Sequence, residues 1–233
     1  MNDRVRTFDN GTTFGSGVAA QQRNKVLRNT YWLLALSMLP TVLGAWVGVS
    51  TGITASLGGG MGLMVFLGGA FGFMFAIEKT KNSAIGVPVL LAFTFFMGLM
   101  LSRLIAMVLG FKNGSDLIMM AFGGTAGVFL VMASLSTVIK RDLTSMGKWL
   151  TVGAVVLMAA AIINVFVASS AGMMAIAVLA IGIFSAFILY DLKRIVDGGE
   201  TNYITATLGL YLSIYNVFQS LLMLLGIGGG SND

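Results

Sequence analysis

Long apolar stretches separated by short polar segments run along almost the whole chain. Seven of them approach or exceed the ~20 residues with which an α-helix crosses the ~30 Å hydrocarbon core of a bilayer. They cover residues 31–49, 60–77, 87–109, 117–138, 150–167, 173–190 and 206–225. Because the connecting segments are short, neighbouring helices must run antiparallel. The pattern predicts an all-α integral membrane protein, with residues 28–228 forming one bundle of seven transmembrane helices.

The last apolar stretch is the most polar of the seven. Its polar side chains recur at helical spacings of three and four residues, at Tyr211, Tyr215, Gln219, Ser213, Asn216 and Ser220. A helix with this many hydroxyl and amide groups cannot face lipid on every side. We therefore expect the other helices to surround it, with its polar face serving either as interhelical glue or as the lining of a cavity.

Small residues four positions apart recur along the chain, and such pairs let two membrane helices approach closely. The pairs are Gly58/Gly62, Gly68/Gly72 and Gly123/Gly127. We interpret them as packing positions between helices. A mobile or ligand-lined seam is the alternative interpretation.

Composition supports the membrane interpretation and narrows the chemistry. Of the 233 residues, 57% are apolar and 10% are charged, against about 25% charged residues in soluble domains. The sequence has no Cys and no His, which excludes disulfides, thiol nucleophiles, imidazole bases and the usual zinc sites. We expect no cofactor, no metal and no small-molecule substrate, and we do not expect an enzyme.

The positive charges lie on one side of the predicted bundle. Twelve of the 14 basic residues fall in the N-terminal tail and in the second, fourth and sixth loops, and only Arg103 and Lys112 fall on the other side. Cytoplasmic segments of membrane proteins carry such an excess of Lys and Arg. The distribution predicts a cytoplasmic N-terminus and a periplasmic C-terminus. The net charge of +5 thus reflects topology and contact with anionic lipid, and we expect no binding of nucleic acid.

The two ends of the chain are predicted to be short tails. Residues 1–27 are rich in Asn, Gly, Thr, Ser and Gln and contain no apolar core long enough for a secretory signal. We expect them to form a disordered cytoplasmic tail. Residues 229–233 would form a short periplasmic tail.

Asp191 is a carboxylate at the inner end of the sixth predicted helix, directly after an apolar run. Charges at such positions are costly and therefore informative. One interpretation is a helix-end carboxylate paired with a nearby cation such as Arg194. The other is a proton-titrating group at the cytoplasmic mouth of a central cavity. The residues leave both open.

Three segments resemble a known family. Residues 198–222 read GGETNYITATLGLYLSIYNVFQSLL and resemble the closing segment of the YccA branch of the transmembrane Bax inhibitor motif family. Residues 25–31, KVLRNTY, resemble the entry to the first helix of that branch, and residues 141–147, RDLTSMG, resemble its loop between helices four and five. Helix number, order and loop lengths are also similar along nearly the whole chain.

The resemblance implies a fold and a function. It implies a seven-helix bundle with the last helix in the middle, in the bacterial inner membrane. It also implies a modulator and slow substrate of the ATP-dependent membrane protease FtsH, with the prohibitin-like proteins HflK and HflC as further partners. The protease would seize the cytoplasmic tail, whose first residues are Met1, Asn2, Asp3 and Arg4.

The alternative function is the pH-sensitive calcium leak of other family members. Those members carry two facing carboxylates, and the resemblance places Asp191 at the first position and Ser213 at the second. A serine cannot titrate in this range, so the pair that would share a proton is halved. The basic residue found after the second helix of leaking members has its nearest counterpart in Lys79. The departures favour the protease modulator over the leak.

Overall fold

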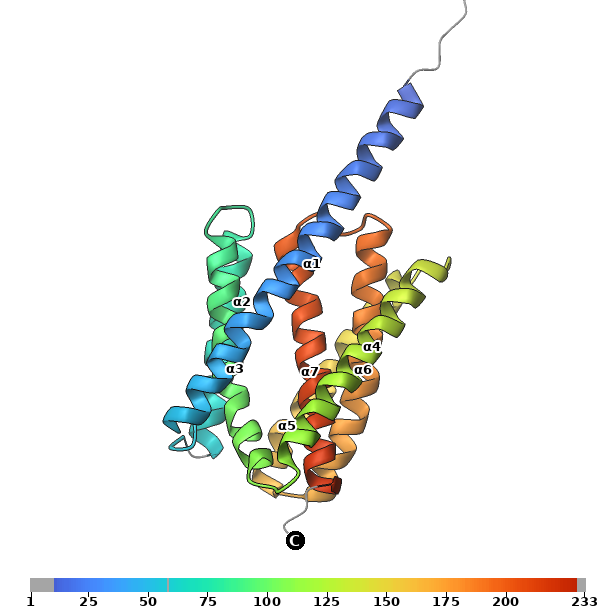
Figure 1. The fold of residues 1–233 in the computed structure, drawn as a ribbon. Helices are drawn as coiled ribbons and strands as arrows, with labels where there is room; N and C mark the ends of the chain where they lie inside the picture. The colour runs from blue at the N-terminus through green and yellow to red at the C-terminus, as the bar shows by residue number, and fades with distance from the viewer. Residues whose placement is uncertain (1–10, 58, 230–233) are drawn as a thin grey trace, which may run out of the picture.

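The computed structural model describes residues 11–57 and 59–229, and within them the backbone forms seven α-helices joined by short loops (Figure 1). The helices are α1 (Gly11–Thr51), α2 (Gly59–Thr80), α3 (Gly86–Leu109), α4 (Gly114–Val138), α5 (Thr144–Val167), α6 (Ser170–Val196) and α7 (Tyr203–Gly229). Each contains a stretch long and apolar enough to cross a membrane. The predicted all-α membrane fold with seven spanning helices is confirmed.

The α1 helix is longer than the sequence pattern predicts. It begins at Gly11, whereas the first span was expected from residue 31 and a disordered tail was expected through residue 27. Residues 18–28 are rich in Ala, Gln, Arg and Lys, which are good helix formers, so the helix continues beyond its apolar part. The predicted protease handle, Met1 to Arg4, lies outside the described residues, as do residues 230–233.

The α7 helix lies in the middle of the bundle, with α1 and α3 on one side and α4 and α6 on the other (Figure 1). Its most apolar window is 44% buried, against 11% for α2 and for α5. Leu210, Val217 and Leu222 on α7 are fully buried. The predicted central position of the last helix is therefore confirmed.

Glycine brings α1 and α3 into backbone contact. A Cβ atom added at Gly98 would overlap the carbonyl oxygen of Thr41, and one added at Gly44 would overlap the carbonyl oxygen of Phe95. No side chain fits between two backbones this close, which is why glycine stands at both positions.

None of the glycine pairs predicted from spacing lies at this contact between α1 and α3. A Cβ at Gly68, Gly72, Gly123 or Gly127 would meet nothing within 4 Å, so these four residues make no close contact with another helix of the described chain. Gly62 has only an ordinary contact with its own chain at Leu57, and Gly58 is outside the described residues. The packing interpretation was wrong for the pairs at 68/72 and 123/127 because spacing alone does not say which face of a helix meets a neighbour.

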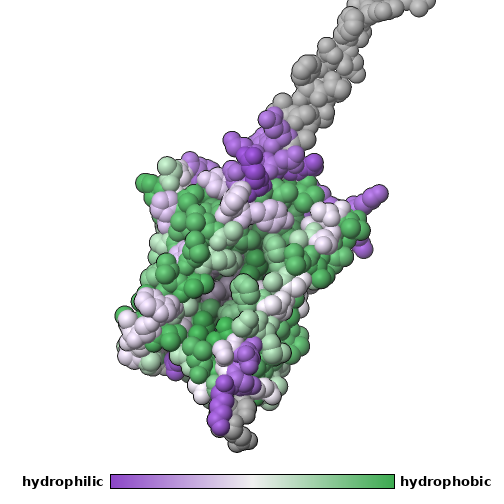
Figure 2. Space-filling view, viewed as in Figure 1, coloured by the Kyte–Doolittle hydropathy of each residue, from purple (hydrophilic) through white to green (hydrophobic). Residues whose placement is uncertain are grey.

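Apolar side chains cover the body of the bundle, and hydrophilic side chains gather at its two ends (Figure 2). Trp32, Trp46 and Trp149 are 73%, 66% and 77% exposed, as in the aromatic belts of membrane proteins. One end carries the α2–α3, α4–α5 and α6–α7 loops, and α1 enters the bundle there (Figure 1). We call it the basic end, because it holds ten Lys and Arg residues: Arg23, Lys25, Arg28, Lys79, Lys81, Lys140, Arg141, Lys148, Lys193 and Arg194.

Candidate functional site

The α6–α7 loop at the basic end is held in place by Asn202. Its side-chain oxygen accepts hydrogen bonds from the backbone amides of Ile204 (2.9 Å) and Thr205 (3.2 Å), so it caps the N-terminus of α7. Its side-chain nitrogen donates to the carbonyl oxygen of Lys81 (3.0 Å) and to Oδ1 of Asn82 (2.9 Å). One residue thus fixes the start of the central helix to the α2–α3 turn.

Asp191 lies on α6 directly against Gly209 of α7. A Cβ atom built on Gly209 would stand 3.1 Å from Oδ2 of Asp191, so a larger residue there would push the carboxylate aside. A pocket of about 200 Å³ opens beside the two residues, and Arg194, Glu200 and Thr205 also line it. We call it the Asp191 pocket. It combines a carboxylate, a cation and a hydroxyl at the end of the central helix.

Arg194 was predicted to be a charge partner of Asp191. In the structure it lines the same pocket but forms its ion pair with Glu200, at 3.1 Å between Nη2 and Oε2. The neighbouring Lys193 pairs with Asp197 at 2.6 Å. Within the described part of the chain, Asp191 forms no ion pair. The two cations next to it in sequence are thus held by other carboxylates.

Ser213 was predicted to face Asp191. It is buried on α7, one helical turn after Gly209, and its hydroxyl donates to the Gly209 carbonyl oxygen at 3.0 Å. No hydrogen bond joins Ser213 to Asp191 among the described residues. Gly209, one turn before Ser213, lies against the carboxylate. Lys79, the other predicted partner, lies at the end of α2 with Nζ 5.4 Å from the ring centroid of Phe75, and it does not line the Asp191 pocket.

Two tyrosines of the predicted polar face connect α7 to its neighbours. The hydroxyl of Tyr211 lies 2.9 Å from Oγ1 of Thr41 on α1 and 3.4 Å from the carbonyl oxygen of Thr94 on α3, to which it donates. The hydroxyl of Tyr215 donates to the carbonyl oxygen of Met97 on α3 at 3.3 Å. Both rings are buried. Of the two roles expected for the polar face, their geometry favours hydrogen bonding between helices over the lining of a cavity.

The remaining members of the polar face lie further along α7. Asn216 is half-buried, and its side-chain nitrogen donates to the carbonyl oxygen of Leu212 in the preceding turn at 2.7 Å. Ser220 is buried and Gln219 is half-buried. The structure does not bring these three residues to the Asp191 pocket, whose lining ends at Leu212.

Sequence reasoning missed four residues of the basic end: Asn202, Gly209, Glu200 and Thr205. Asn202 had a readable signal, since an Asn just before a helical segment is a typical N-cap. No signal in the sequence indicated that Gly209 lies against Asp191, because this contact depends on the register between α6 and α7.

Comparison with known proteins places the chain in a family. Residues 23–230 match the family described as inhibitor of apoptosis-promoting Bax1. The modulator of FtsH protease YccA of Escherichia coli K12 is 39% identical over 208 residues, which cover 87% of this chain and 90% of the relative. An uncharacterised membrane protein of Vibrio cholerae is 37% identical over 206 residues, 88% of this chain and 91% of that protein. An uncharacterised protein of Pseudomonas aeruginosa is 38% identical over 218 residues, 93% and 96% of the two chains. With its seven apolar helices and this match along nearly its whole length, the chain belongs to the Bax inhibitor family of membrane proteins.

Proposed function

We propose that this chain modulates the ATP-dependent membrane protease FtsH and is itself a slowly degraded substrate of that protease. The observation that carries the proposal is the 39% identity with the E. coli modulator of FtsH protease along 87% of the chain. In this proposal the protein acts by occupying the protease and performs no chemistry of its own. HflK and HflC, which accompany FtsH, are proposed as further partners.

The charge distribution supports an orientation with the basic end in the cytoplasm of a bacterial inner membrane. Ten basic residues of the described chain lie at that end, and the sequence has two more, Arg4 and Arg6, before α1. The N-terminal part of α1 projects from the bundle there (Figure 1). A segment that projects beyond the membrane is accessible to a cytoplasmic protease, so we propose residues 1–10 as its handle.

The packing of α7 supports slow degradation. To extract the chain, the protease must separate the central helix from α1 and α3 and break the hydrogen bonds of Tyr211 and Tyr215. In hydrocarbon, each polar group left without a partner costs several kcal/mol. The protease would therefore need a long time to degrade each molecule of this protein, and it would be occupied during that time.

The test combines turnover with copurification. In cells with FtsH, deletion of residues 1–10 should lengthen the half-life of the protein, and deletion of residues 230–233 should leave it unchanged. The full chain, purified in mild detergent, should bring FtsH, HflK and HflC with it. Equal turnover of both deletion variants would refute the handle, and absence of FtsH from the purified material would refute the proposed function.

A second candidate is a pH-sensitive cation leak. The Asp191 pocket favours it, because a carboxylate without an ion pair in the described chain faces a pocket at the basic end. Ser213, in place of a second carboxylate, argues against it. Calcium flux into proteoliposomes at mildly acidic and mildly alkaline pH tests this candidate. Flux equal to that of empty vesicles, or unchanged by Asp191→Asn, would reject it.

A further inference from the structure

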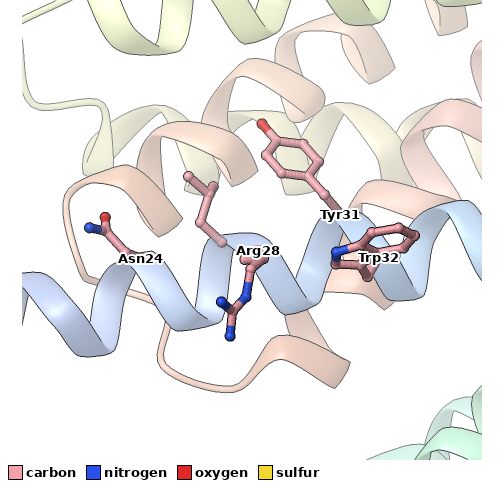
Figure 3. Close-up of a pocket in the computed structure, with 5 residues that line it drawn as sticks. Asn24, Arg28, Tyr31 and Trp32 are labelled. Atoms are coloured by element: carbon pink, nitrogen blue, oxygen red, sulfur yellow. The ribbon is translucent and has the colours of Figure 1, made fainter.

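A surface pocket lies along α1 where the helix enters the bundle at the basic end (Figure 3). Its volume is about 420 Å³, and its lining residues are Asn24, Leu27, Arg28, Tyr31 and Trp32. Tyr31 projects from α1, and its ring packs edge-on against Phe129 of α4, with 6.3 Å between the ring centroids. The pocket thus lies on α1 next to the point where Phe129 of α4 meets that helix.

The lining changes from polar to apolar along the helix. Asn24 and Arg28 stand on the side of the basic end, and Tyr31 and Trp32 follow one turn later toward the middle of the bundle. Trp32 is 73% exposed and Tyr31 is 37% exposed. Exposed Trp and Tyr rings at the start of an apolar stretch, as here, are typical of the level of lipid headgroups. The order of groups matches that of a phospholipid, with its phosphate outward and its chains inward.

The cation of this pocket has no ion-pair partner in the part of the chain that the structure describes. Arg28 is exposed and forms no ion pair or hydrogen bond with the described residues. The α1 helix contains no Asp or Glu, and Arg23 and Lys25 add two further positive charges within five residues. The pocket therefore carries a positive potential that nothing on its own helix offsets.

We propose that this pocket binds the headgroup of one anionic glycerophospholipid from the leaflet around the basic end. The guanidinium of Arg28 would bind the phosphate in the two-pronged geometry that arginine favours, and the Asn24 amide would donate to headgroup oxygens. Leu27, Tyr31 and Trp32 would contact the glycerol and the upper acyl chains.

Trp32 provides a direct probe of the lipid. The full chain with Trp46→Phe and Trp149→Phe keeps it as the single tryptophan, and both replaced side chains are exposed. After reconstitution, quenching of its fluorescence is compared for phosphatidylglycerol and phosphatidylethanolamine, each brominated on the acyl chains and present at the same mole fraction. We expect stronger quenching by phosphatidylglycerol, and a relative affinity that falls about tenfold in Arg28→Gln, since that variant loses charge-assisted hydrogen bonds to the phosphate.

Two variants separate a site from general surface attraction. Arg23→Gln removes the same charge from the same helix but does not line the pocket, so it should keep most of the preference. Arg28→Lys should keep part of it. Equal quenching by the two lipids, or a loss in Arg23→Gln as large as in Arg28→Gln, would overturn the proposal. Native mass spectrometry of the chain with all three tryptophans gives an independent readout, the ratio of bound phosphatidylglycerol to bound phosphatidylethanolamine.

Discussion

Replacing Gly98 by alanine would put a methyl group against the backbone of α1. The added Cβ would overlap the carbonyl oxygen of Thr41 and stand 3.0 Å from the backbone nitrogen of Ala45. Backbone atoms cannot rotate away as a flexible side chain can, so α1 and α3 must separate. Overpacking of this kind costs about 1–3 kcal/mol, and a rigid obstacle places it near the upper value. Alanine recovers about 1 kcal/mol through its better helix propensity. The net loss is then about 2 kcal/mol.

Gly72→Ala is the matched control for this change. Gly72 is exposed on α2, and a Cβ there would meet nothing within 4 Å. The same substitution should therefore be neutral or stabilising by up to about 1 kcal/mol. Titration of the purified chain with a denaturing detergent in mixed micelles, followed by circular dichroism, measures both free energies of unfolding. Equal stability of the two variants would refute the direct backbone contact between α1 and α3.

Three further predictions concern the ends and the centre of the bundle, all measured by the same titration. Asn202→Ala removes the cap of α7 and two donated hydrogen bonds, so it should lower the free energy of unfolding by about 2–3 kcal/mol. Asn202→Asp should lower it less, because the aspartate keeps the cap. A smaller loss in the alanine variant would contradict the role of Asn202 in linking α7 to the α2–α3 turn. Tyr211→Phe removes the hydroxyl bonded to Thr41 and should cost about 1 kcal/mol, whereas no loss would show that this bond contributes nothing. Asp142 accepts hydrogen bonds from the hydroxyl and amide of Thr144, which lower the pKa of its carboxyl below the ordinary 3.8. The lowered pKa stabilises the fold above about pH 4. The unchanged chain should therefore be more stable than Asp142→Ala above that pH, and the difference in free energy of unfolding should shrink as the pH falls below it. A difference that stays constant with pH would be evidence against the lowered pKa.

The spans and the central place of α7 were readable from the sequence for one physical reason. Apolar length determines what can cross a bilayer, and a row of hydroxyl and amide groups determines which helix must avoid lipid. Neither inference depends on which helices are in contact with one another. The long α1 was missed because a polar segment that contains Ala and Gln beside Gly and Thr can form either a tail or a helix, and only the structure of residues 11–27 decides between them.

The parts of the site that depend on helix register were not readable. The family resemblance paired Ser213 with Asp191, but the sequence could not show that Gly209 lies against the carboxylate, because that depends on the register between α6 and α7. Which glycines touch a neighbour depends in the same way on the rotation of each helix. Gly98 and Gly72 are alike in sequence terms, yet one lies against a backbone and the other faces open space.

The central position of α7 has a consequence for the order of assembly. Among the seven described helices it is the last to be synthesised, yet it fills the middle of the bundle. The contact between α1 and α3 can form early, whereas Thr41 and the carbonyl groups of Thr94 and Met97 gain their tyrosine partners only when α7 has been inserted. A ribosome that stalls before residue 203 would leave a six-helix chain with an unfilled centre. Native packing of this bundle is therefore completed only after α7 has been synthesised and inserted.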